Sequence, residues 1–133
     1  MTSENIENKL ATGLRYFLAV VFLSAGVGRL IFPELIRLEA SELNLPSFFP
    51  YLIIAFEILA GACLLLGKNT RLAYFSLTIF LSLALIWALV LKGSVMLTQI
   101  GELFIFNLNP TDWFLHLIFL GIVIILLKLE RNR

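Results

Sequence analysis

Residues 50–91 read PYLIIAFEILAGACLLLGKNTRLAYFSLTIFLSLALIWALVL, two long apolar runs separated by a short polar turn. A bilayer core of about 30 Å needs about 20 helical residues, so each run is long enough to cross a membrane. Pro50 suits the first helical position, where its missing N–H has no partner to lose. The tight turn at Gly67–Arg71 makes the two runs antiparallel neighbours. We therefore predict adjacent membrane helices over residues 50–66 and 72–91.

Two more apolar runs, residues 14–32 and 113–129, lie on either side of this pair. Phe32-Pro33 predicts the end of the first helix, and Asn109-Pro110 predicts a cap and a first-position proline that open the last. The first run is too long for the core of a cleaved signal peptide. Only 14% of the residues are charged, against about 25% in soluble domains. The sequence therefore predicts an all-α integral membrane four-helix bundle in a single domain, residues 1–133.

Two connections between the predicted spans are long. Residues 33–49 alternate apolar and charged side chains, which predicts a short interfacial helix lying on the membrane surface. Residues 93–112 are apolar but contain Gly93 and Gly101, which predicts an apolar outer loop that either dips into the membrane interface or packs over the mouth of the bundle.

Positive charges predict the orientation of the four spans. One side carries seven basic residues, Lys9, Arg15, Lys68, Arg71, Lys128, Arg131 and Arg133, and the other carries three, Arg29, Arg37 and Lys92. We therefore expect both termini in the cytoplasm and the chain in a bacterial-type cytoplasmic membrane. The net charge of +1 provides no field for binding nucleic acid.

Glu57 is the most informative single residue, because it lies about seven residues, or roughly 10 Å, inside the second span. An ionisable group at that depth is costly and often functional. Arg29 lies about a turn inside the end of the first span, in the same half of the membrane, and we predict that it pairs with Glu57. For Glu57 the alternatives are a purely structural ion pair and a protonated carboxyl bonded to a backbone carbonyl. For Arg29 the alternative is a side chain that extends to the lipid head groups.

His116 is the only histidine, and it follows Asp112 by one helical turn, a spacing that brings two side chains together. The carboxylate would orient the imidazole for proton exchange, although a polar cap at a helix start explains the same pattern. One histidine excludes a bis-histidine haem within the chain. A single cysteine, Cys63, excludes an internal disulfide, and we expect no intrinsic metal site.

The order of these features resembles the DoxX superfamily, which includes DoxX, DoxD and MauE-like membrane proteins. The resemblance rests on Leu14-Arg15, on Phe22 to Leu30 (FLSAGVGRL), where arginine stands in place of the usual lysine, and on Glu57 to Gly67 (EILAGACLLLG). It implies a four-helix membrane bundle associated with quinone-linked oxidation of sulfur compounds, with redox partners, or with the maturation of other proteins. MauE-like members often carry two cysteines before the last helix, whereas residues 99–104 here contain none. Thiol–disulfide chemistry is therefore not expected.

Three functions remain open at this stage. The first is a redox-associated membrane subunit whose ligand-binding residues are Arg29, Glu57, His116 and Asp112, with a quinone as the ligand. The second is a non-catalytic accessory subunit that packs against a larger membrane complex. The third is a small-solute carrier, for which the chain lacks the repeated broken helices. In each case the expected partners are the lipid bilayer and other membrane proteins, and the chain is not expected to be an enzyme on its own.

Overall fold

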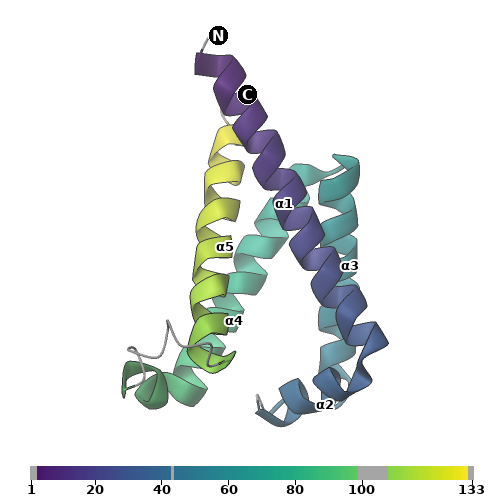
Figure 1. Cartoon of the computed structure of the whole chain (residues 1–133), viewed down its shortest axis with the longest axis vertical. Helices are drawn as coiled ribbons and strands as arrows, with labels where there is room; N and C mark the ends of the chain where they lie inside the picture. The colour runs from purple at the N-terminus through teal and green to yellow at the C-terminus, as the bar shows by residue number, and fades with distance from the viewer. Residues whose placement is uncertain (1–2, 43, 99–107, 132–133) are drawn as a thin grey trace. The chain divides into compact units, whose positions relative to one another are not determined.

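The computed structural model describes residues 3–42, 44–98 and 108–131, and every regular element among them is an α-helix (Figure 1). Four of the helices contain a segment long and apolar enough to cross a membrane: Asn5–Ile31, Phe49–Leu66, Thr70–Leu91 and Trp113–Glu130. The predicted all-α class is therefore confirmed, and each predicted span corresponds to one of these candidate segments. Such a set of helices is consistent with a four-helix membrane bundle. In chain order the helices are α1 (Ser3–Ile31), α2 (Pro33–Glu42), α3 (Phe49–Leu66), α4 (Thr70–Thr98) and α5 (Leu108–Arg131).

The chain forms two compact units that divide between Ala73 and Tyr74. The first unit contains α1, α2, α3 and the first turn of α4. Its buried apolar side chains come mainly from the three complete helices, and they include Leu18, Ala19, Phe22, Ile36, Ile54, Ala60 and Leu64, with Ala73 from the first turn of α4. The second unit contains the rest of α4 together with α5, and it buries Leu77, Leu81, Val123 and Leu126.

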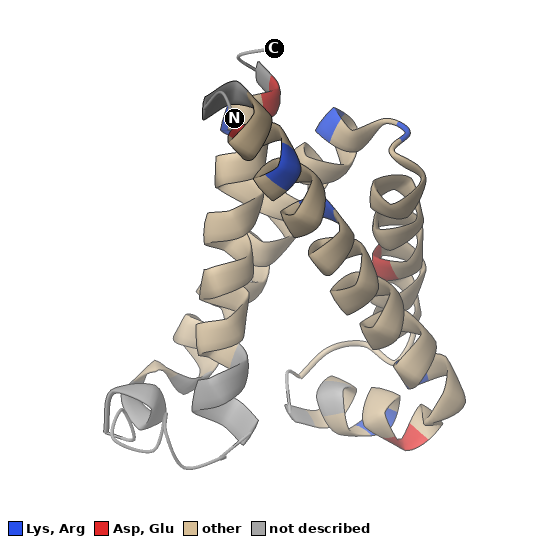
Figure 2. Cartoon of the chain, turned by 45° about the horizontal axis from the view of Figure 1, so that its top comes forward, with Lys and Arg blue, Asp and Glu red and all other residues tan. Residues whose placement is uncertain are grey.

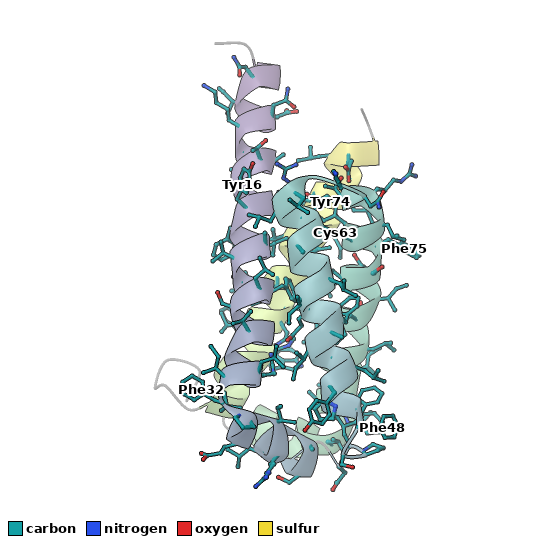
Figure 3. The ribbon with its side chains drawn as sticks, turned by 90° about the vertical axis from the view of Figure 1, so that its right-hand side faces the viewer. Tyr16, Phe32, Phe48, Cys63, Tyr74 and Phe75 are labelled. Atoms are coloured by element: carbon teal, nitrogen blue, oxygen red, sulfur yellow. The ribbon has the colours of Figure 1, made fainter. Side chains whose placement is uncertain are left out.

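Helices α1 and α3 pack side by side and run in opposite directions (Figures 1 and 3). Going along α1 from Arg15 to Arg29, the neighbouring residues of α3 run backwards from Gly67 to Glu57. Tyr16 and Cys63 accordingly lie towards one end of the pair in Figure 3, and Phe32 and Phe48 lie at the other. We call the latter the α2 end, because α2 joins the two helices there.

Proline and glycine set the ends of these helices as the sequence predicts. Phe32 lies outside both α1 and α2, and Pro33 begins α2, because a residue that precedes proline is disfavoured in the helical conformation. The predicted short helix after the first span is therefore present. Pro50 lies in the first turn of α3, and Gly67 ends that helix with a left-handed φ of 66°. The N–H of Lys68 donates to the carbonyl of Cys63 at 3.1 Å, which closes the helix terminus.

The predicted loop over residues 93–112 is shorter than expected. Helix α4 continues through Gly93 to Thr98, and α5 already begins at Leu108. A glycine inside a helix costs only about 1 kcal/mol relative to alanine, which is too little to end a helix that lacks proline. Pro110 falls within the first turn of α5 rather than at its first position. Proline is tolerated throughout that turn, because the N–H groups there have no partner within the helix. The remaining part of the predicted loop, including Gly101, lies outside the described residues.

Candidate functional site

An ion pair joins α1 to α3 near their α2 end. The Nη1 atom of Arg29 donates to both carboxylate oxygens of Glu57, at 2.8 Å to Oε2 and 3.1 Å to Oε1. The Glu57 side chain is 6% exposed and the Arg29 side chain 19%. Glu57 is the one acidic residue within α3, which Figure 2 shows as a single red position along that helix. The predicted pairing of Arg29 with Glu57 is confirmed.

Two glycines bring the helices close enough for this pair to form. A Cβ atom on Gly26 of α1 would lie 2.7 Å from the Cγ1 of Ile58 and 3.4 Å from the Cβ of Glu57. A Cβ atom on Gly61 of α3 would lie 2.8 Å from the Cγ of Leu23, and 3.0 Å from its backbone nitrogen. Small residues at such positions let helix backbones approach in a membrane. Ala60 and Gly61 follow Glu57 at spacings that place all three residues on one face of α3.

The position of the pair explains why the charges are tolerated. Glu57 begins the third turn of α3, where an unpaired carboxylate in hydrocarbon would be very costly. Two hydrogen bonds from a guanidinium offset much of that cost, because charge-assisted bonds are stronger than neutral ones. The arginine is the less buried partner and lies in the last turn of α1, so its long stem reaches inwards from the α2 end.

A second arginine holds the opposite end of the same helix pair. The Nη1 atom of Arg15 lies 2.8 Å from the place where a Cβ on Gly67 would be, against the C-terminus of α3. A cation there interacts favourably with the negative end of the helix dipole. Sequence reasoning used Arg15 as a positive charge and as part of the family motif, and it missed this contact. Its separation from Arg29 by fourteen residues, close to four helical turns, is the signal that places both arginines on one face of α1.

The two other residues of the predicted site belong to α5 in the second unit. His116 is half-buried on that helix. Asp112 lies in its first turns, and its side chain is not among those the structure describes. The pairing of Asp112 with His116 stays a prediction. The convergence of all four residues on one ligand stays a prediction as well.

Taken together, these features define a small integral membrane protein whose charged centre is a buried pair between its first and third helices. A family model described as DoxX matches residues 10–91, which contain α2, α3 and most of α1 and α4. Because the match covers more than half of the chain, the protein belongs to the DoxX family, as its sequence motifs suggest. Searches of curated proteins and of solved structures gave no match. Both arginines of α1 and Glu57 fall inside the matched region, whereas His116 and Asp112 fall outside it.

Proposed function

We propose that this DoxX-family protein is a redox-associated membrane subunit that binds a quinone or a similar amphipathic carbonyl compound beside Arg29. The observation that carries the proposal is the partly exposed guanidinium held against a buried carboxylate within a membrane-spanning helix pair. Ligand sites are mostly apolar, with a few placed polar groups that fix orientation. The surroundings of Arg29 on α1 and α3 have that composition. The resemblance to proteins associated with quinone-linked oxidation supports the same ligand class.

The two charged residues would have different roles in such a site. Quinone carbonyls accept hydrogen bonds, and a guanidinium carries five N–H donors in a planar fork. Glu57 engages one nitrogen of that fork, Nη1, and thereby fixes the orientation of the whole group. Because Arg29 is the more exposed partner, it would contact the ligand, and Glu57 would act as a positioning residue. In this proposal His116 and Asp112 supply protons from the fourth span.

A second candidate function is an accessory subunit that packs against a larger membrane complex. The observation that favours it is the geometry of the pair itself. Both carboxylate oxygens of Glu57 accept hydrogen bonds from Arg29, and two glycines allow the adjacent turns of α1 and α3 to pack closely. A pair of this kind also serves as an internal brace that keeps α1 and α3 rigid while their exposed apolar faces contact lipid or a partner. In that case the pair stabilises the fold and binds no ligand.

Ligand-dependent melting distinguishes the two candidates, because a ligand that binds only the folded state raises its apparent stability. The purified protein in mild detergent is titrated with short-chain ubiquinone and menaquinone analogues. Arg29→Lys keeps the charge but loses the planar fork, so we expect it to fold and to lose most of the wild-type Tm rise. His116→Ala should also reduce the rise, and Arg37→Gln, which changes an exposed residue of α2, should leave it unchanged.

Two results would exclude the quinone site. One is the absence of any Tm shift with the wild-type protein across both analogue series. The other is an equal shift in wild type, Arg29→Lys and His116→Ala. Either result would favour the accessory subunit, for which a co-purifying membrane protein in stoichiometric amount is then the expected finding.

A further inference from the structure

The end of the α1–α3 pair opposite α2 gathers basic residues from two segments of the chain. Arg15 of α1 lies against Gly67, the residue that ends α3. Lys68 follows directly, and Arg71 lies in the first turn of α4, still within the first compact unit. Lys68 and Arg71 are exposed and Arg15 is half-buried. The chain thus places three positive charges around one helix terminus.

The carboxylates whose side chains the structure describes in the first unit lie away from that terminus. Glu57 is engaged by Arg29 towards the α2 end. Glu34 lies on α2, beyond that end, and Glu7 lies about two turns of α1 before Arg15 and is exposed. Within the described part of the first unit, the charges nearest to Gly67 are therefore basic.

The surroundings of the Arg15 side chain also favour ligand binding at this terminus. Its guanidinium carbon lies 4.9 Å from the centre of the Tyr16 ring, which restricts the side chain. Its Nε atom is buried and has no hydrogen-bond partner among the described residues. Buried donors are normally satisfied, so this atom is a candidate contact for an acceptor. An oxyanion beside Arg15 would also meet the charges of Lys68 and Arg71.

The surroundings of the three basic residues favour a lipid as the source of that oxyanion. The end of α3 is the end of a predicted membrane span, and lipid phosphates lie at that level of a bilayer. Leu65 and Leu66, just before Gly67, are 44% and 69% exposed, so apolar surface for acyl chains adjoins the charges. Basic pockets between membrane helices bind anionic head groups in this manner.

We infer that the end of the α1–α3 pair at Gly67 binds the phosphodiester of an anionic phospholipid through Arg15, Lys68 and Arg71. The lipid head group thereby contacts both α1 and the segment that follows α3, at the end of these helices opposite Arg29 and Glu57. This site does not depend on quinone binding, because it shares no residue with the proposed quinone site.

The test is the melting of the full-length protein in dodecyl maltoside with added phosphatidylglycerol or with phosphatidylcholine of the same acyl chains. We expect phosphatidylglycerol to raise Tm more, with saturation. Each basic residue near an anionic surface contributes about 1 kcal/mol, a factor of about five in affinity. Arg15→Gln should therefore raise the half-saturating lipid concentration about fivefold. Arg37→Gln, which removes one positive charge from α2, is the matched control and should leave it unchanged.

Because Arg15 also contacts the end of α3, Arg15→Gln can weaken folding as well as lipid binding. A double variant at exposed residues separates the two effects. Lys68→Gln with Arg71→Gln changes only exposed side chains, and it should reduce the affinity for phosphatidylglycerol by at least about fivefold. Equal effects of the two lipids would overturn the proposal, as would an unchanged response in both variants or an equal loss in Arg37→Gln. If inorganic phosphate alone reproduces the full Tm rise, the site binds free phosphate and the assignment to a lipid is wrong.

Discussion

Glu57 shows how the cost of a buried charge can be used to predict a contact. Its depth in an apolar helix requires a cation or a proton, and Arg29 is the only basic residue near the end of the first span. The pair is found in the structure with two hydrogen bonds. The contact of Arg15 with Gly67 could not be predicted in the same way. A residue near the end of a span can extend into water, so its position in the sequence alone does not require a partner inside the protein.

The glycines of the helix pair permit a direct test of the packing. Gly61→Ala would place a methyl group 3.0 Å from the backbone nitrogen of Leu23, and 3.1 Å from the carbonyl oxygen of Ala19. Backbone atoms cannot move away cheaply, so we expect a loss of stability of about 1–3 kcal/mol, measured by thermal unfolding in detergent.

Gly28→Ala on α1 is the matched control for that substitution, because nothing lies within 4 Å of the place where a Cβ on Gly28 would be. Alanine is the better helix former, and the control should be neutral or more stable by up to about 1 kcal/mol. Equal stability of the Gly61→Ala and Gly28→Ala proteins would show that α1 and α3 do not approach each other as closely as the structure has them.

At the scale of elements, sequence reasoning was most accurate where proline or a turn glycine acts on the backbone. The ends of α1 and α3 follow from Pro33, which disfavours the helical conformation at Phe32, and from Gly67, which readily adopts the left-handed φ that ends α3. The end of α4 was wrong by seven residues, because Gly93 is compatible with a helix that continues to Thr98. Helix ends without proline depend on the balance of solvation and packing, which a single sequence does not specify.

At the scale of the whole molecule, apolar length alone predicts four spans, since each of the four runs is long enough to cross a bilayer. Whether residues of α5 take part in a ligand site is a different matter. It depends on contacts between helices that are uniformly apolar, and many side-chain combinations satisfy such contacts. For this reason the roles proposed for His116 and Asp112 rest on the sequence alone.

The orientation of the molecule is a prediction that reporter fusions can check. The seven-to-three distribution of basic residues predicts that both termini face the cytoplasm. A reporter fused after residue 133 should therefore be active in the cytoplasm, and one fused after residue 40, at the α2 end, should be active on the outside. Equal signals from the two fusions would contradict an arrangement of four spans with this orientation.

The central claim is that Arg29 and Glu57 act as one unit that holds α1 to α3 and organises the site of the protein. Breaking a buried pair by removing one partner typically costs about 3–5 kcal/mol, because the other charge is left unpaired. The direct measurement is a double-mutant cycle on thermal unfolding in detergent, with Glu57→Gln, Arg29→Gln and the combination. We predict that the double variant loses at least about 1 kcal/mol less than the sum of the single losses. Combining Glu57→Gln with Arg37→Gln should be additive, whereas strict additivity of Glu57→Gln with Arg29→Gln would contradict the claim.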